Sequence, residues 1–405
     1  MPPVTEADIN LASYYAQKLK EFGQAFTTAD GRDGALRDFK KDWLQIKLGF
    51  DRVSSIFSRQ REAARICVNF VNNKGLWLLD IHRPISERLS WFELARRAAL
   101  LIGDDESLVI ILHNLGIATL NLAKPSDAIQ FHKKELAIAR RIKHAVGKAQ
   151  ATSSIGTCYR HLGQYRQALR WHKKVLLLED TEEIAHVRLN AVGNIGITLM
   201  LLRQPEAACE YFETVREMTR RLERRREEAY AIGYLGRAYQ DMGRPKEAAA
   251  QHKQALAISR EISDTFGEAS ALGGLGNALL DLQNIPQALT CHREQLRLAE
   301  VTAQPVAVAE ALINLGISLL HNNKEVEAAS RRDESIAIYE RIGNQAALAA
   351  LKERWSVACE GLGKFGDAIS FCESALEISI RHKLPGMRAL KVRTERLQRA
   401  TLKSV

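Results

Sequence analysis

A fixed spacing of 40 residues is the feature that most constrains what this 405-residue chain can fold into. Glycine recurs at this spacing, each time after Leu or Ile, at Gly116, Gly156, Gly196, Gly236, Gly276 and Gly316. Twelve residues further on, alanine recurs without interruption at Ala128, Ala168, Ala208, Ala248, Ala288, Ala328 and Ala368. A period of this length is typical of stacked supersecondary units that share one continuous core. We therefore predict a repeat array instead of several separate globular domains.

Each 40-residue unit has the pattern of two helices joined by a short turn. In the unit 144–183, apolar residues recur at helical spacing over 144–162 and again over 165–178, and Gly163-Gln164 separates the two runs. Proline or glycine recurs at this turn in other units, as expected where one helix ends and the next begins. The pattern predicts an all-α fold, a right-handed α-solenoid of antiparallel helix pairs with helical caps at both ends.

The position of each residue within the repeat divides the chain into four segments. We expect an N-terminal helical cap, a degenerate first helical repeat, seven regular units and a basic C-terminal capping helix over residues 1–59, 60–103, 104–383 and 384–405, respectively. In the first two segments, helices are predicted over 6–26, 35–57, 60–82 and 85–102. In the last segment, Leu390 and Leu397 share one apolar side, which suits a helix that covers the end of an array.

The net charge of +10 is concentrated in two short stretches. Residues 216–226 contain six arginines and two glutamates, and residues 381–403 contain eight lysines or arginines and one glutamate. The rest of the chain is therefore close to neutral. Localised positive charge of this kind favours contact with phosphate groups or with acidic partners.

Several features favour a folded cytoplasmic protein. No run of about 18 apolar residues is present, so we expect no transmembrane helix and no membrane partner. The first residues lack the basic and apolar regions of a signal peptide. The six cysteines form no Cys-x-x-Cys pair, and Cys158, Cys209 and Cys291 fall within apolar helical patterns. We interpret them as small buried thiols in a reducing compartment.

The order Leu-Gly, then Ala, then His or a bulky residue, then Leu resembles the tetratricopeptide repeat. The unit here has 40 residues, whereas the usual repeat has about 34. In this respect the chain is similar to Pins/LGN-type polarity scaffolds and to arrays in many bacterial regulatory proteins. The resemblance implies that the first helix of each unit lines a concave groove, where amides and arginines hold an extended peptide.

The segment before the array resembles one found in bacterial STAND-type (NB-ARC-like) NTPases. The likeness is carried by Asp42-Trp43-Leu44-Gln45-Ile46, by Leu78-Leu79-Asp80-Ile81-His82-Arg83-Pro84 and by Glu87-Arg88-Leu89-Ser90-Trp91. The chain lacks the Gly-x-x-x-x-Gly-Lys-Ser/Thr phosphate loop that such an NTPase needs. The likeness therefore implies a sensor or adaptor part, and the NTPase activity is not carried over.

Three consecutive units have glycine three residues before the repeated Leu-Gly glycine, at Gly193, Gly233 and Gly273. Each costs about 1 kcal/mol relative to alanine inside a helix. One explanation is a deepened groove where a partner's backbone can approach closely. The other is tight packing between the first helices of neighbouring units.

Polar side chains gather around the same positions in the middle units. Amide, hydroxyl and guanidinium groups can bind the backbone of an extended peptide without demanding one side-chain sequence. The predicted peptide-binding residues are Asn190, Asn194, Tyr230, Arg237, Gln240, Asn277, Asp281, Arg160 and His161. An ordinary solvated surface is the alternative interpretation.

The arginine-rich stretch indicates a second kind of ligand. Arginines near a helix C-terminus stabilise the helix dipole, but six within residues 216–226 exceed that need. Polyanion binding is therefore an alternative, through Arg216, Arg220, Arg221, Arg224, Arg225 and Arg226. Neither basic stretch contains an aromatic residue, so stacking on single-stranded bases is not supported.

We expect no metal, no cofactor and no catalytic site. Histidine recurs at one position of the second helix, at His132, His172, His252 and His292. Neighbouring helices lie about 8–10 Å apart, too far for histidines of different units to share one zinc ion. The glycine-rich stretch 272–276 lies within a predicted helix and follows no strand, so it is not a dinucleotide-binding loop.

The sequence therefore predicts a non-catalytic tetratricopeptide-repeat adaptor or sensor that binds a peptide or protein segment in its concave groove. One alternative is a regulator that contacts nucleic acid or another polyanion through the two basic stretches. Another is a sensor subunit that contacts an effector protein on a separate chain through residues 35–103.

Overall fold

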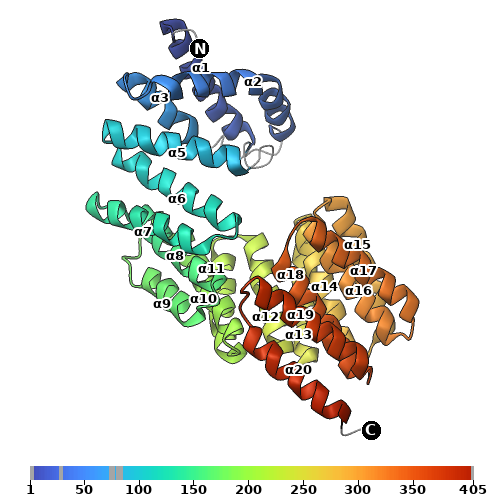
Figure 1. The fold of residues 1–405 in the computed structure, drawn as a ribbon. Coiled ribbons are helices and arrows are strands. Elements are labelled where there is room, and N and C mark those ends of the chain that lie inside the picture. Colours follow the sequence, from blue (N-terminus) through green and yellow to red (C-terminus); the bar gives the residue numbers. More distant parts are fainter. Residues whose placement is uncertain (1–3, 27–30, 73–77, 79–84, 403–405) are drawn as a thin grey trace. The chain divides into compact units, whose positions relative to one another are not determined.

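The computed structural model describes residues 4–26, 31–72, 78 and 85–402, and these residues form helices and turns without a strand. The helices are α1 (Glu6–Phe26), α2 (Arg32–Ile56), α3 (Arg61–Val71), α5 (Ile85–Ile102), α6 (Asp105–Asn121), α7 (Pro125–Arg141), α8 (Ala145–His161), α9 (Tyr165–Leu176), the short 3₁₀ helix η1 (Glu182–Ile184), α10 (Ala185–Leu201), α11 (Pro205–Arg221), α12 (Arg225–Asp241), α13 (Pro245–Glu261), α14 (Thr265–Asp281), α15 (Ile285–Thr302), α16 (Pro305–His321), α17 (Glu325–Arg341), α18 (Gln345–Gly361), α19 (Phe365–Arg381) and α20 (Met387–Leu402). Successive helices form antiparallel hairpins (Figure 1). The predicted all-α solenoid is confirmed.

The chain packs as two compact units, Met1–His161 with Gln167–Ala191, and Leu162–Arg166 with Val192–Val405. Each unit has its own buried apolar core. The four segment boundaries that we derived from the repeat remain predictions.

The helix predicted over 60–82 is shorter than expected, because α3 ends at Val71. Asn72 leaves the helical conformation with φ −102° and ψ 52°. Its side-chain amide donates a hydrogen bond to Ser107 Oγ at 2.9 Å. Asparagine favours helix ends because its amide competes with the helical backbone for hydrogen bonds.

An aromatic cluster forms the core around α2, α3 and α5. The rings of Phe50 and Trp91 stack at 4.1 Å between centroids, and Trp43 stacks on Trp91 at 5.8 Å. This stacking gives Trp43 and Trp91 a packing role. Both belong to the stretches that resemble STAND-type proteins. The stretch Leu79–Pro84 of that likeness lies outside the described residues.

Left-handed residues separate the helices at a spacing of 20. Positive φ angles occur at Gly103, Ala123, Lys143, Gly163, Arg203, Glu223, Gly243, Ser263, Gln283, Ala303, Asn323, Gly343, Gly363 and Lys383. A left-handed residue directly after a helix is a common way to end it. The 40-residue sequence period therefore consists of two structural steps of 20 residues.

The series of left-handed residues skips position 183. In this unit, 144–183, the second helix is shorter than predicted. We expected this helix over 165–178, but α9 ends at Leu176. The Arg188 guanidinium donates to the carbonyl oxygens of Leu176 at 3.2 Å and Leu178 at 3.0 Å. These bonds satisfy carbonyl groups that a longer helix would have paired. Because α10 still begins 40 residues after α8, the irregular segment keeps the repeat spacing.

The glycine and histidine positions are two sides of one contact within a hairpin. A Cβ on Gly116 would lie 2.4 Å from the His132 ring, and a Cβ on Gly236 would lie 2.7 Å from His252. Gly156 faces His172 and Gly276 faces His292 in the same way. The first helix therefore needs glycine here because a flat ring of the second helix rests directly on its backbone.

The segment Glu182–Leu201 is long and apolar enough to cross a membrane by length and composition alone. Half of the residues in its apolar stretch are buried inside the fold. Ile184, Val187 and Ala191 form a buried cluster with Ala149 and Val175. We therefore interpret this segment as a core helix.

All six cysteines are free, and their burial differs. Cys158 is buried as predicted, and burial raises the pKa of its thiol to about 12. Cys209 and Cys291 are only half-buried, contrary to the prediction. Each is next to a buried residue of the second helix, Ala208 and His292 respectively, and so lies beside the buried stripe.

Candidate peptide-binding surface

The first helices of successive units line the inner side of the second compact unit. α12 contacts α14, α14 contacts α16, and α16 contacts α18, in addition to the contacts within each hairpin. Among the described residues 225–381, the second helices α13, α15, α17 and α19 make no contact of similar extent with one another. In a curved stack of hairpins, the helices on the inside of the curve touch and those on the outside diverge. We call the solvent-facing side of α12, α14 and α16 the inner surface.

Two of the three unusual glycines face open space. A Cβ on Gly233 would meet no atom within 4 Å, and a Cβ on Gly193 would meet only Val215, at 3.9 Å. A Cβ on Gly273 would lie 2.6 Å from the Gln295 amide. Tight packing therefore explains Gly273, whereas packing does not require glycine at positions 193 and 233.

Three predicted binding residues in the second compact unit have side chains without a hydrogen-bond or ion-pair partner among the described residues. Arg237 on α12 is exposed, and Asn194 on α10 and Asn277 on α14 are half-buried. Arg237 and Asn277 are 40 residues apart, so they occupy the same position on two helices that touch. Their polar groups are available to a ligand.

Three other predicted residues are used in contacts between neighbouring helices. The Tyr230 hydroxyl donates to Asp264 Oδ2 at 3.3 Å, and burial together with this carboxylate raises the pKa of Tyr230. The Gln240 amide on α12 donates to Asp281 Oδ2 on α14 at 3.1 Å. These side chains hold adjacent units together, so the available donor set is smaller than predicted.

The remaining predicted residues belong to the first compact unit. His161 and Asn190 are exposed, and Arg160 is half-buried. Their participation with residues of the second unit in one binding site remains a prediction.

Most of the arginine-rich stretch is neutralised by nearby carboxylates. The ion pairs are Arg216–Glu213, Arg221–Glu217, Arg225–Glu228, Arg225–Glu261 and Arg226–Asp264, with N–O distances of 2.5–3.2 Å. Arg220 and Arg224 are exposed and form no ion pair within the described chain. Surface pairs contribute little stability, but here they leave much less free positive charge than the sequence indicates.

The basic C-terminal helix covers the last hairpin. Leu390 and Leu397 of α20 are buried in the same cluster as Trp355. Arg393 and Arg396 both pair with Glu360 of α18, at 2.8 and 2.6 Å. Part of the positive charge of this helix therefore serves its docking.

A polar network between α15 and α18 was not foreseen from the sequence. Glu310 accepts hydrogen bonds from the Arg354 guanidinium at 2.7 Å and from the Tyr339 hydroxyl at 2.8 Å. Asn314 bonds to Arg354 and donates to Gln295 Oε1 at 3.0 Å. The available signal was that Arg354 follows Asn314 by 40 residues, which places both on the same side of their helices.

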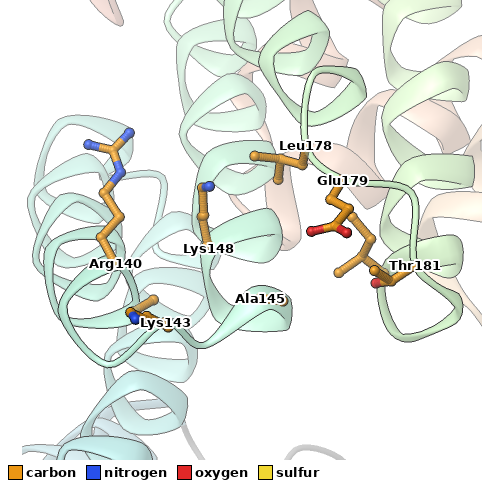
Figure 2. A pocket seen from close by; sticks show the side chains of 9 residues that line it. Arg140, Lys143, Ala145, Lys148, Leu178, Glu179 and Thr181 are labelled. Atoms are coloured by element: carbon orange, nitrogen blue, oxygen red, sulfur yellow. The ribbon is translucent and has the colours of Figure 1, made fainter.

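The irregular segment after α9 borders a pocket that the sequence also did not indicate. Its volume is about 280 Å³. Figure 2 shows Glu179 and Thr181 of the loop lying across the pocket from Lys148 of α8. The lining residues are Ala139, Arg140, Lys143, Ala145, Lys148, Leu178, Glu179, Thr181 and Ile184.

Comparison with known proteins identifies the repeat. A family model described as tetratricopeptide repeat matches residues 107–178 and 187–261. A search of curated protein sequences gave no match.

Several solved structures share the fold at low sequence identity. A Rap protein complexed with Competence and Sporulation Factor is 15% identical, with a TM-score of 0.60 over 91% of this chain and 98% of that chain. The apo form of the quorum sensor NprR from B. thuringiensis is 13% identical, with a TM-score of 0.59 over 89% of this chain and 97% of that chain.

A STAND protein with a tetratricopeptide repeat sensor from Pyrococcus horikoshii is 14% identical, with a TM-score of 0.53. The match covers 98% of this chain and 60% of that chain. The chain thus carries tetratricopeptide repeats over residues 107–178 and 187–261, and its fold is that of tetratricopeptide-repeat proteins.

Proposed function

We propose that the chain is a non-catalytic adaptor or sensor that binds a peptide or protein segment along the inner surface. The observation that carries the proposal is the open space at Gly233 beside the exposed Arg237, which has no ion-pair partner among the residues that the structure describes. These residues are four apart on α12 and therefore lie on the same face of the helix. A ligand backbone can approach the helix at the glycine while the guanidinium donates hydrogen bonds to its carbonyl oxygens.

The neighbouring helix extends this arrangement. Asn277 on α14 occupies the position that Arg237 has on α12, and the two helices touch. Two donors on helices about 8–10 Å apart could bind carbonyl groups two to three residues apart on one extended chain. The ligand would then be recognised mainly through its backbone.

The similar structures support this class of function. One is a Rap protein in complex with Competence and Sporulation Factor, and another is a quorum sensor. We further propose a cytoplasmic location, which agrees with the free cysteines, and an effector protein on a separate chain as an additional partner.

The polyanion alternative is less favoured. Glutamate and aspartate side chains pair with four of the six arginines in 216–226. A phosphate backbone would have to compete with these carboxylates, and Arg220 and Arg224 alone offer a small binding surface.

Affinity capture from an extract of the source cells tests the proposal. Wild-type protein and three variants are compared at low and moderate salt with nuclease present. We expect one partner that wild type retains at both salts and that Arg237→Glu loses, without a change in Tm because Arg237 is exposed. The matched control is Arg220→Glu/Arg224→Glu, which should retain the partner.

The third variant, Gly233→Ala, separates binding from stability. Its Cβ meets open space, so the substitution should stabilise the helix by about 1 kcal/mol. A more stable variant that binds more weakly would show that the ligand approaches the helix there. Equal retention by wild type, Arg237→Glu and Gly233→Ala would refute the inner-surface proposal, and salt-labile, nuclease-sensitive retention would favour polyanion binding.

A further inference from the structure

Three potential metal ligands converge within the hairpin of α6 and α7. His113 Nδ1 lies 3.0 Å from Glu135 Oε1, and His132 Nδ1 lies 2.8 Å from Glu135 Oε2. One ligand atom from each residue lies within 4.8 Å of the other two. Two imidazoles with one carboxylate are a common ligand set for first-row transition metals.

Burial makes this cluster unusual. The side chains of Glu135 and His132 are 0% and 1% exposed, whereas that of His113 is 19% exposed. A buried carboxylate is costly unless a cation or hydrogen-bond donors compensate for lost hydration. Among the described residues, the two imidazoles supply that compensation, and His113 connects the cluster to solvent.

Packing of the repeat does not require these residues. In the next hairpin, Ser153 occupies the position of His113, and Val175 occupies that of Glu135. That hairpin folds with the same histidine–glycine contact, between His172 and Gly156. The imidazole of His113 and the carboxylate of Glu135 are therefore additions to a contact that forms without them.

From the sequence we expected no metal at all, on an argument that considered only histidines of different repeats. His113, His132 and Glu135 instead belong to one hairpin, so the distance between units does not separate them. His132 Nε2 rests against Gly116 and has no hydrogen-bond partner in the described part of the chain, whereas Nδ1 faces the carboxylate.

We propose that His113 Nδ1, His132 Nδ1 and a carboxylate oxygen of Glu135 bind a divalent first-row transition metal ion of the zinc class. Tetrahedral bonds of about 2.0–2.1 Å place neighbouring ligand atoms about 3.3 Å apart. The two nitrogen–oxygen contacts, at 3.0 and 2.8 Å, are slightly shorter and involve different oxygens of Glu135, so the imidazoles and the carboxylate must all shift slightly to receive the ion. Three protein ligands leave a fourth position for water on the exposed side of His113.

Metal titration of the full-length, tag-free protein tests the proposal. The protein is first cleared of metal with a chelator and then titrated with Zn²⁺ in competition with a chromophoric chelator. A parallel titration with Co²⁺ reports coordination geometry through its visible absorption. We expect one ion per chain and the intense bands of four-coordinate Co²⁺.

Three variants assign the ligands. His113→Ser copies Ser153 of the next hairpin, so it should fold, and Glu135→Gln keeps the side-chain volume. Each should weaken Zn²⁺ binding more than about 100-fold, because outer-shell changes alone cost 10–100-fold. The control His252→Phe changes a histidine at the same repeat position as His132 and should bind like wild type.

Two results would overturn the proposal. One is the absence of Zn²⁺ binding by wild type in competition with the chelator. The other is undiminished binding by His113→Ser, which would assign the ion to other groups, such as the free cysteines. A correctly folded His113→Ser protein that has lost the Co²⁺ bands supports the site.

Discussion

At the scale of single residues, the repeated histidines act as flat packing groups. His172 and His252 are buried against glycines, and neither ring nitrogen of either residue has a hydrogen-bond partner in the described structure. Phe212 occupies the equivalent position against Gly196. In these three repeats a flat ring fills the position, and the packing does not depend on ring nitrogens.

Burial makes this packing sensitive to pH. It lowers the pKa of His172, His252 and His292 to about 4, whereas an unfolded histidine titrates near 6.5. Well above pH 6.5 both states are neutral, so these residues add no pH dependence there. Between pH 6.5 and 4 the unfolded chain binds more protons than the folded chain, so stability decreases as pH falls.

The variant His252→Phe should lack the part of the acid-induced loss of stability that is due to His252. A tenfold change in proton affinity corresponds to about 1.4 kcal/mol, so each histidine accounts for a loss on the order of 3 kcal/mol by pH 4. Urea denaturation at pH 7 and at pH 4.5 measures the difference. The variant should match or exceed wild type at pH 7 and lose less stability at pH 4.5. The exposed His186→Phe serves as control, and an unchanged pH dependence in His252→Phe would contradict the assignment.

At the scale of elements, the chain reverses through one left-handed residue every 20 positions. These residues include Ala303 and Glu223 as well as Gly243 and Gly343. A left-handed conformation costs a non-glycine residue about 1–2 kcal/mol. Because that cost is small beside the packing of a hairpin, residue type varies at these positions.

A reciprocal pair of substitutions tests this cost. Gly243→Ala should destabilise the protein by about 1 kcal/mol through the backbone alone, because an added Cβ meets no atom within 4 Å. Ala303→Gly, at φ 51°, should stabilise it by about 0.5–1 kcal/mol. Chemical denaturation at pH 7 gives both values. Changes of the same sign in the two variants would contradict the backbone explanation.

The same elements show what could be foreseen from the sequence. The 40-residue period was visible because glycine is required wherever a ring rests on the backbone, as at Gly116. The 20-residue step was hidden because many residue types adopt the left-handed conformation. The early end of α9 was also hidden, because the guanidinium that stabilises it belongs to Arg188, 12 residues after Leu176.

The sequence predicted on which helices the candidate residues lie, but not which of them form hydrogen bonds with other side chains. Repeat spacing placed Arg237 and Asn277 on neighbouring first helices, as the structure has them. It could not show that Gln240 is used by Asp281, because such pairs depend on side-chain rotamers of two helices. The approach of His113 to Glu135 was missed for the same reason, since 22 residues and a turn separate them.

At the scale of the whole molecule, the stability of each hairpin should depend mainly on the hairpins next to it. A repeat array gains most of its stability from contacts within each hairpin and with the adjacent one. The two compact units have separate cores, and α20 belongs to the core around Trp355 in the second unit. A defect in α20 should therefore affect its nearest hairpin most and the first unit least.

Hydrogen exchange on a Leu397→Ala variant tests this distribution. Leu397 is 1% exposed, and truncation of a buried leucine costs about 2–5 kcal/mol. Amides of α18 and α19 should exchange faster, because the lost stability lowers the free energy of local opening. Amides of α2 and α3 should keep their wild-type rates. The exposed Arg399→Ala on the same helix should change neither set. If Leu397→Ala accelerated exchange equally in α2, α3, α18 and α19, the chain would unfold as one cooperative body, and local coupling along the array would be the wrong description.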